Sequence, residues 1–423
     1  MKLAIENGDK TIREDYFPYD SNSCNDNLIT EVNDVLKSGS FSMFDNPKVK
    51  EFEDKFGKYV NSKNTIAVTN CTSALFASLK ALNVGGDDEV ILPSYTYVAT
   101  LMSVLATGAK PVFVDIDKTV NMDVKQLKNK ITNKTKAIIP VHMFGNPCNM
   151  NEIMKLNIPV VEDCAHATGA KYRGKNVGSF GIGCHSFGEA KVLRIGEGGA
   201  VTTNNDEITK QVRILRHEGE IIKRFDENIT QVSEITASDW INGVEYPRIG
   251  YNFRFSPILA AVAMHKLKEL PEFIEGFNRN ALQIKNELKN VKELKFQEDT
   301  DEGRIYSNIP CTIESNEFTR NTLYASLALE GIPIGVYFPT NLAKIKIIND
   351  KGNYPETDKF CNNHLILPNY PNLNKENIKV MCDKVKEVVE YLRKNGKKVE
   401  DKAEKILKER KINKFYSTIH VTL

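Results

Sequence analysis

The chain has 423 residues, of which 41% are hydrophobic, and its 57 basic side chains nearly balance its 55 acidic ones. This length allows two or three domains, and the balanced charge argues against nucleic acid or an anionic membrane as the main partner. The N-terminus lacks the apolar core of a signal peptide, and no apolar run approaches the roughly 20 residues of a membrane span. The eight cysteines form no CxxC pair. We therefore expect a cytoplasmic protein with reduced thiols that acts on a small molecule, and we assign no metal site.

Helix-like and strand-like segments alternate from about residue 48 to residue 165. The predicted helices are 48–60, 73–82 and 98–105, and the predicted strands are 65–68, 89–92, 111–114, 137–141 and 160–161. Short apolar strands separated by helices predict an α/β fold with a mostly parallel sheet covered on both faces. Ligands collect beyond the carboxyl ends of such strands, where Asn70, Ser94, His142 and Asp163 lie.

Longer helical segments follow Pro257 and predict a smaller α+β domain. We predict helices at 258–270, 278–288 and 319–329, and a strand at 304–309. Asn374 is expected to cap a final helix, whose apolar face is formed by Ile378, Met381, Val385, Val388 and Leu392. The predicted division is a large domain at 1–255, a small domain at 256–395 and a charged extension at 396–423. The extension is either an exposed helix with a tethering strand or a loose tail.

Lys191 and Asp163 together predict a pyridoxal phosphate enzyme. Such enzymes hold the cofactor aldehyde on a lysine as a Schiff base, and they place a carboxylate against the pyridine nitrogen. Asp163 ends the apolar stretch 158–161, and Lys191 follows in the run Ser186-Phe187-Gly188-Glu189-Ala190-Lys191. A lone lysine would be no evidence, because most lysines are solvated surface charges.

The segment Asn70–Leu75 joins a predicted strand to a helix, so its backbone N–H groups could bind a phosphate. The hydroxyls of Thr72 and Ser186 could assist, although an ordinary N-cap and a turn serine are the alternatives. Tyr95 and Tyr97 follow the next strand, where one ring could stack on a pyridine or simply pack.

Together these segments resemble the DegT/DnrJ/StrS family of fold type I pyridoxal phosphate enzymes, which aminate keto-sugars. The collinear matches extend over nearly all of residues 1 to about 395; they are 70–75, 85–97, 108–115, 140–142, 162–167, 186–199 and 250–254. The resemblance implies an aspartate-aminotransferase-like large domain whose active site is shared within a homodimer.

The resemblance also implies roles for individual residues. Lys191 is similar to the Schiff-base lysine, Asp163 to the partner of the pyridine nitrogen, and Asn252 to an asparagine that reaches the phosphate from the neighbouring subunit. The implied cofactor-binding residues are Cys71, Thr72, Tyr97, Asp163, His166, Ser186, Lys191 and Asn252. The candidate substrate-binding residues are Tyr95, His142, Arg194, His217 and Tyr337.

Three features before residue 395 depart from the family pattern, and the charged extension after about residue 395 has no counterpart in it. Cys71 stands where the family commonly has glycine, so the phosphate loop must accommodate a side chain. Arg194 stands where relatives often have a small polar residue; it either binds a phosphate or carboxylate of the substrate or pairs with a surface acid. A longer segment at 220–248, which contains Trp240, either lines the substrate pocket or is a surface insertion.

The resemblance implies transfer of an amino group from L-glutamate to a keto-sugar, with a nucleotide-linked sugar of surface-polysaccharide or glycoconjugate synthesis as the favoured acceptor. Lys191 supports amino transfer, since some relatives replace this lysine with histidine and are dehydratases. Two alternatives stay open: the same chemistry on a keto-inositol or phosphorylated keto compound, and a pyridoxal phosphate-binding regulator without turnover.

Overall fold

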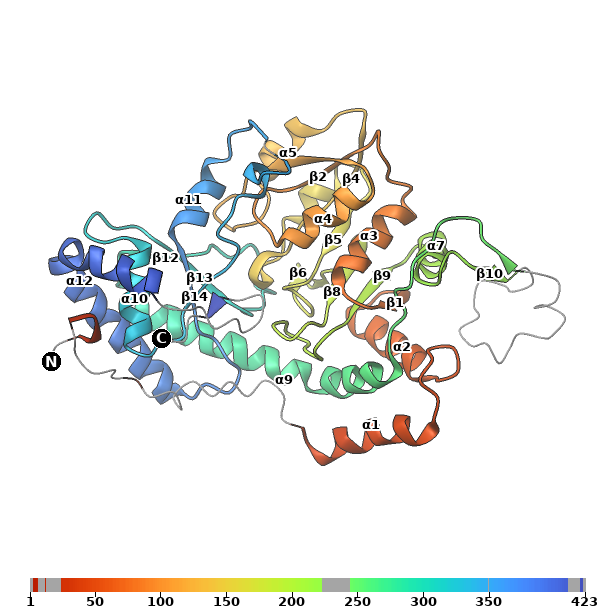
Figure 1. Cartoon of the computed structure of the whole chain (residues 1–423), viewed down its shortest axis with the longest axis horizontal. Coiled ribbons are helices and arrows are strands. Elements are labelled where there is room, and N and C mark those ends of the chain that lie inside the picture. Colours follow the sequence, from red (N-terminus) through yellow and green to blue (C-terminus); the bar gives the residue numbers. More distant parts are fainter. Residues whose placement is uncertain are drawn as a thin grey trace.

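One mixed sheet forms the framework of the chain's first half (Figure 1). The computed structural model describes residues 3–6, 12, 24–222, 244–348, 350–409 and 419–420. One part of the sheet has the order β1 (Asn64–Val68), β9 (Gly199–Thr203), β8 (Ile182–Ser186) and β5 (Val161–Asp163). The other part has the order β3 (Lys110–Val114), β2 (Glu89–Pro93) and β4 (Thr135–Ile138). Backbone bonds from Ile138 to Pro159 and from Asp163 to Pro140 join the two parts into what we call the first sheet.

The first sheet is mostly parallel, as predicted, and helices cover both of its faces. Only β9 pairs antiparallel to its neighbours β8 and β1 among the described strands of this sheet. Successive side chains of a strand face opposite sides, and Ile66 and Ala67 of β1 accordingly enter two different apolar cores. The core around Ile66 contains α3 (Cys71–Ala81), α4 (Val98–Ala106) and α7 (Asp206–Arg216). The core around Ala67 contains α2 (Lys48–Val60) and the first part of α9 (Pro257–Leu288).

Helix α9 runs below both halves of the chain (Figure 1), from α2 toward α10 (Arg320–Leu329) and α12 (Lys375–Glu409). Two separate helices were predicted here, and that prediction is wrong, because the helix continues through Pro271. Proline removes one hydrogen bond of the helix and disfavours its interior. Burial of Leu267, Leu270 and Phe277 on either side of Pro271 outweighs this cost.

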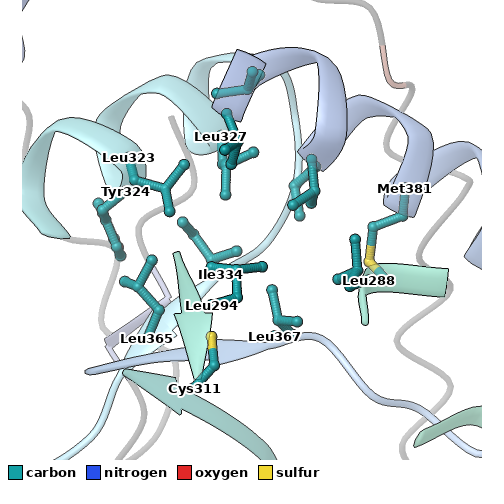
Figure 2. Close-up of a cluster of buried hydrophobic side chains, with 14 of the residues drawn as sticks. Leu288, Leu294, Cys311, Leu323, Tyr324, Leu327, Ile334, Leu365, Leu367 and Met381 are labelled. Carbon is teal, nitrogen blue, oxygen red and sulfur yellow. The ribbon is translucent and has the colours of Figure 1, made fainter. Parts of the chain in front are cut away.

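A second, antiparallel sheet organises the C-terminal half. Its strands have the order β12 (Leu294–Phe296), β13 (Ile309–Ile313), β15 (His364–Leu367), β14 (Gly335–Val336) and β16 (Ile419–His420). Helices α10 and α12 pack over it, and their apolar side chains meet those of the strands (Figure 2). The predicted stripe of α12 is confirmed: Ile378, Met381, Val385, Val388 and Leu392 are all buried.

The strand predicted at 304–309 is displaced, because β13 begins only at Ile309. The apolar residues Ile305 and Tyr306 are buried, but their backbone groups do not join a sheet. The N–H of Ile305 instead donates to the Gly145 carbonyl at 3.0 Å, and that of Tyr306 donates to Asn278 Oδ1 at 2.9 Å. The segment is a buried connection whose burial pattern resembles that of a strand.

Both ends of the described chain reach the core of the second sheet. Leu3, Ile5 and Ile12 enter it from the N-terminal side, where Ala4–Glu6 form a short 3-10 helix. Val399 and Ala403 of α12 enter it beyond residue 395. The predicted boundaries at 255 and 395 therefore do not coincide with the limits of this core. Helix α12 continues to Glu409 and β16 pairs with β14, which favours the interpretation of the extension as a helix with a tethering strand.

The remaining described elements are short or peripheral. They are α1 (Asp26–Ser38), α5 (Val124–Lys130), α6 (Met150–Met154), α11 (Pro355–Asn363), the 3-10 turns Met143–Gly145 and Leu342–Lys344, and the strand pairs Lys171–Tyr172 with Lys175–Asn176 and Ile221–Ile222 with Val244–Glu245. Trp240 and most of the 220–248 segment lie outside the described residues, so its role stays a prediction. Among the described helices, none combines the length and apolarity needed to cross a membrane.

Candidate active site

A cavity of about 350 Å³, here called the main cavity, opens where β5 and β8 end and α3 begins. Most of the residues predicted to bind the cofactor line it, together with several that were not predicted. Its lining includes Asn70, Cys71, Thr72, Thr96, Tyr97, Thr100, Asp163, His166, Ser186, Lys191 and Phe338. The carboxyl edge of the first sheet therefore holds the predicted constellation.

Asp163, the last residue of β5, presents a buried carboxylate to the main cavity. Its Oδ2 accepts a hydrogen bond from Thr100 Oγ1 at 2.9 Å, and its Oδ1 accepts one from the Ala165 N–H at 3.1 Å. Burial raises the pKa of the Asp163 carboxyl above its usual value, while these two hydrogen bonds and the charge of Lys191 act in the opposite direction. The two hydrogen bonds thus stabilise the Asp163 carboxylate anion, although burial alone would favour the neutral acid.

Lys191 lies in the loop between β8 and β9, where its backbone N–H donates to the Gly188 carbonyl at 3.0 Å. Burial lowers the pKa of the Lys191 ammonium, and Asp163 and then Cys71 partly counteract this effect. A lysine with a lowered pKa has a larger share of free amine at neutral pH. It is therefore a better nucleophile and proton acceptor than a surface lysine.

The start of α3 is built to bind an anion. Asn70 caps the helix by accepting from the Ser73 N–H at 2.9 Å, while the N–H groups of Cys71 and Thr72 before it have no acceptor within the helix. Gly199 of β9 lets the loop approach closely, because a Cβ there would lie 2.5 Å from the Asn70 carbonyl carbon. The Cys71 thiol is buried and donates to the Cys184 carbonyl at 3.5 Å. The side chain that replaces the expected glycine is thus held by β8.

Aromatic rings form another wall of the main cavity. Tyr97 is 44% exposed, and its ring centre lies 5.3 Å from that of Phe338. Phe338 was not predicted as a site residue, although its neighbour Tyr337 was. Its φ of +45° is strained for a bulky residue, and such strain is typical of functional sites. Tyr97 keeps the exposure that a ring-stacking residue needs.

His166 is buried beside the cavity, and its Nδ1 has no hydrogen-bond partner among the described residues. Burial, followed by the charge of Lys191, lowers the pKa of His166 well below its ordinary value. A buried polar atom without a partner indicates a missing ligand. With the Asp163 carboxylate, the Lys191 amine and the anion-binding start of α3, this donor set fits pyridoxal phosphate. Lys191, Asp163, His166, Thr72 and Ser186 are the residues that could hold it.

Three of the polar residues predicted at strand ends lie behind the main cavity rather than in it. Tyr95 is fully buried and donates its hydroxyl hydrogen to the Tyr337 carbonyl at 2.9 Å. Ser94 is buried against Thr357, with 2.7 Å between their hydroxyl oxygens. His142 is also fully buried. The interpretation of Tyr95 and His142 as direct substrate ligands is therefore not supported by their positions.

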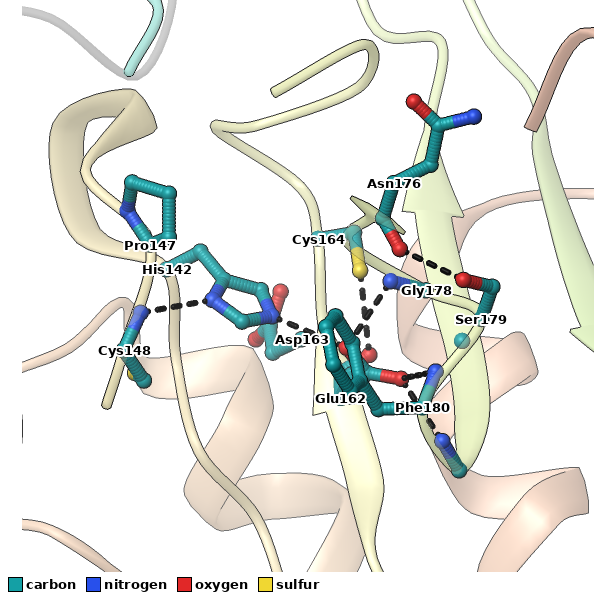
Figure 3. Close-up of polar contacts among 12 residues, drawn as sticks. His142, Pro147, Cys148, Glu162, Asp163, Cys164, Asn176, Gly178, Ser179 and Phe180 are labelled. Atoms are coloured by element: carbon teal, nitrogen blue, oxygen red, sulfur yellow. Dashed lines mark hydrogen bonds and ion pairs between the residues drawn. The ribbon is translucent and has the colours of Figure 1, made fainter. Parts of the chain in front are cut away.

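His142 belongs to a buried network centred on Glu162 (Figure 3). Its Nε2 lies 3.2 Å from Glu162 Oε2, and its Nδ1 accepts from the Cys148 N–H at 3.0 Å. Backbone N–H groups of residues 178, 180 and 181 also donate to the Glu162 carboxylate, each at 2.8 Å. Burial raises the pKa of Glu162, but His142 and the backbone donors outweigh it and lower this pKa overall.

His142, Glu162 and Cys164 place three ligand-type atoms within 4.8 Å of one another. Both carboxylate oxygens of Glu162 already accept hydrogen bonds, and so does His142 Nδ1. A metal ion would have to compete with these bonds. The cluster is explained by its network without an ion, and the assignment of no metal site stays a prediction.

His217 and Asn252 lie together but outside the described lining of the main cavity. His217 Nδ1 lies 2.8 Å from Glu218 Oε2, and its ring centre is 4.5 Å from that of Phe44. Asn252 is exposed. Within a single chain, neither His217 nor Asn252 therefore lies where it could bind a substrate or cofactor in the main cavity.

Arg194 and Tyr337 line a second, smaller cavity, here called the side cavity, which shares Ala190 and Lys191 with the main one. The predicted substrate residues therefore separate into three groups. Arg194 and Tyr337 lie near Lys191, Tyr95 and His142 are buried behind the site, and His217 lies elsewhere.

This fold and site define a pyridoxal phosphate-dependent aminotransferase of fold type I. Residues 22–386 match the model of the DegT/DnrJ/EryC1/StrS aminotransferase family, and the chain belongs to that family. The resemblance predicted from its motifs is confirmed.

Two relatives and one solved structure illustrate the similarity. The chain is 33% identical to GDP-perosamine synthase of Escherichia coli O157:H7 over 366 residues, which are 84% of this chain and 94% of that protein. It is 33% identical over 365 residues to UDP-2-acetamido-2-deoxy-3-oxo-D-glucuronate aminotransferase of Pseudomonas aeruginosa, again 84% of this chain and 94% of that protein. The structure of an aminotransferase from Psychrobacter cryohalolentis has a TM-score of 0.79 and 26% identity, and the match covers 89% of this chain and 98% of that one.

Thr100 on α4 was missed by the sequence interpretation, and its contact with Asp163 gives it a testable role. Thr100→Val removes a hydrogen bond that lowers the pKa of Asp163, so this pKa rises and the carboxylate is lost at a higher pH. We expect kcat/KM to fall about tenfold at neutral pH, since a hydrogen bond to a charged group contributes about 1.5 kcal/mol or more. The acidic limb of the pH profile of kcat/KM should therefore move to higher pH.

The measurement is kcat/KM between pH 5 and 9 for the parent and for Thr100→Val. Thr107→Val is the matched control, because the Thr107 hydroxyl donates to the Val104 carbonyl at 2.7 Å and accepts from the Ala109 N–H at 3.2 Å, outside the lining of the main cavity. Identical acidic limbs for the parent and Thr100→Val would show that this hydroxyl does not tune Asp163.

Proposed function

We propose that the chain transfers an amino group from L-glutamate to a nucleotide-linked keto-sugar in surface-polysaccharide or glycoconjugate synthesis. The observation that carries this proposal is the convergence of Lys191, Asp163 and the unpartnered His166 on one cavity of a family member. The names of two relatives, GDP-perosamine synthase and UDP-2-acetamido-2-deoxy-3-oxo-D-glucuronate aminotransferase, support a nucleotide-linked acceptor.

Lys191, Asp163, Thr72 and Ser186 of the main cavity each have a chemical role in this proposal. Pyridoxal phosphate, when bound, supplies an electron sink for the bond broken beside the amino group. Asp163 holds the pyridine nitrogen in its protonated form, and the start of α3 binds the phosphate with Thr72 and Ser186. Lys191 would hold the cofactor aldehyde. Its Nζ, whose pKa is lowered by burial, would be the base that accepts the proton from the α-carbon of the donor.

We also propose that two copies share their active sites. Asn252 is exposed and lies outside the described lining of the main cavity of its own chain. Its resemblance to an asparagine that reaches the phosphate of the neighbouring subunit supports a shared site. Light scattering should give a mass twice that of one chain, and a monomer with full activity would contradict the shared site.

The proposed location is the cytoplasm. All eight cysteines are free thiols, seven of them buried, which is typical of a reducing compartment. Fractionation of the native host with a compartment marker tests this location, and enrichment outside the cytoplasmic fraction would contradict it.

The first test of function follows the two half-reactions in sequence. L-glutamate added to the loaded protein should convert the visible absorbance of the bound cofactor aldehyde to the ultraviolet absorbance of its amine form. A nucleotide-linked keto-sugar should then restore the visible band and yield an amino-sugar detectable by mass spectrometry. D-glutamate is the control donor. No spectral change with L-glutamate would refute the proposed donor, and no recovery with keto-sugars would refute the proposed acceptor class.

A further inference from the structure

The side cavity lies next to Lys191 and has a volume of about 60 Å³. It is bounded by the loop after β8, by α9, and by segments near residues 307, 337 and 366–370. Its polar lining is formed by Lys191, Arg194, Ser307, Asn308, Tyr337, Asn369 and Tyr370. Roughly 10–15 Å³ of such a volume is enough for one water molecule, so the cavity has room for a group the size of a carboxylate or phosphate.

Arg194 brings an uncompensated positive charge to this cavity. Arg194 is only 8% exposed, and its Nε is buried without a hydrogen-bond partner among the residues that the structure describes. Among the described residues that line the side cavity, none is acidic. A buried guanidinium without a counter-ion is costly, and burial is normally accompanied by pairing with an anion.

Neighbouring polar groups complete the lining. Lys191, three residues before Arg194, lines the same cavity, so a group bound there lies next to the reacting residue. Asn308 Nδ2 donates to the Tyr337 hydroxyl at 3.1 Å and fixes that ring in the wall. Asn369 donates to the carbonyls of Phe277 and Tyr306, and its buried Oδ1 has no partner among the described residues. The cavity therefore offers the Arg194 guanidinium to an anion and one acceptor to a hydroxyl or N–H group.

We propose that the side cavity is an anion subsite in which Arg194 binds a carboxylate or phosphate group of the molecule that reacts at Lys191. This inference rests on the proposed function, because it places the anion on a reactant of amino transfer. The planar guanidinium suits such groups, since it can donate two parallel hydrogen bonds to their oxygens. Two reactants can supply the anion: a carboxylate of L-glutamate, or the acidic part of the keto-sugar.

The test compares Arg194→Gln, Arg194→Lys and the parent, each loaded with pyridoxal phosphate. The donor arm measures how the rate of the spectral change depends on L-glutamate concentration. The acceptor arm measures inhibition of that change by GDP-mannose and UDP-glucuronate, which carry the acidic groups but no ketone. Arg173→Gln is the matched control, because Arg173 is exposed in the turn between two short strands and outside both cavities.

If Arg194 binds the donor, Arg194→Gln should raise the half-saturating L-glutamate concentration at least tenfold with little change in the maximal rate. If it binds the acceptor, that concentration stays constant while the inhibition constants of the sugar nucleotides rise at least tenfold. Arg194→Lys, which keeps the charge, should recover part of either loss, whereas a purely structural role would give no such recovery. Changes below twofold in both arms would overturn the anion subsite.

The two proposals fail in different ways. A parent protein that does not respond to L-glutamate would contradict the proposed donor, while direct calorimetric binding of the sugar nucleotides would still test Arg194. If Arg194→Gln does not fold, inorganic phosphate provides a second measurement on the parent. Competition by phosphate in the millimolar range, weakened but not abolished in Arg194→Lys, supports the subsite, and no competition overturns it.

Discussion

Lys191→Ala is expected to lower the rate of amino transfer at least about 10³-fold, the largest effect predicted for any side chain of the site. The substitution removes both the amine that holds the cofactor aldehyde and the base that moves the proton, and proton transfer alone contributes about 10²–10⁴-fold. Phosphate binding at the start of α3 does not depend on this amine, so the fold and part of the cofactor affinity should persist. Steady-state rates and borohydride reduction measure the two losses separately.

Borohydride reduction should fix the cofactor to the peptide that contains residue 191 in the parent and leave that peptide unmodified in Lys191→Ala. Lys58→Ala on α2 is the matched control, because Lys58 is exposed and outside the described lining of both cavities. Normal transfer by Lys191→Ala, or fixation at another lysine, would remove the basis of the proposed mechanism.

Asp163→Asn is expected to lower kcat about 100-fold while retaining a cofactor-binding protein. Asparagine preserves the size of the side chain and an oxygen that can accept from Thr100, so the loss isolates the negative charge. Removing one partner of a buried ion pair costs about 3 kcal/mol or more, which corresponds to about 100-fold in rate. The measurement is kcat at saturating substrates, with cofactor content determined for each preparation.

The pH profile distinguishes a charge effect from a loss of packing. Because burial raises the pKa of Asp163, the parent should lose activity as falling pH protonates this carboxylate. Asp163→Asn has no such group and should lack that acidic limb. Asp206→Asn serves as the control, since Asp206 is an exposed carboxylate at the start of α7. Turnover of Asp163→Asn at the parent rate would show that no anion is needed against the pyridine nitrogen.

Local patterns were sufficient to predict much of the fold. The helix α2 and the strands β1 and β2 follow periodic apolar residues, and Asn374 caps α12 by accepting from the Asn377 N–H at 2.7 Å. The prediction failed where distant contacts outweigh local preference. Pro271 is tolerated because α9 is buried on both sides of it, and residues 304–306 are buried without joining a sheet.

The cofactor-binding residues could be predicted because the chemistry requires an unusual combination of side chains. A lysine and an aspartate at expected positions indicated the cofactor, and both line one cavity. The sequence could not indicate Thr100, because its bond to Asp163 joins residues 63 positions apart. His142 was misplaced for a related reason: the end of a strand defines an edge of the sheet, but not whether a side chain there faces a cavity or the interior.

Glu162 and Asp163 are adjacent carboxylates on β5 with opposite surroundings, since neighbouring residues of a strand face opposite sides. Glu162 holds the turn at residues 178–181, and Asp163 faces the cavity. A substitution at either position disturbs one side of the sheet. Insertion or deletion of a single residue before them would exchange their directions and disturb both sides at once. In an evolving lineage, this strand can therefore change its side chains far more readily than its length.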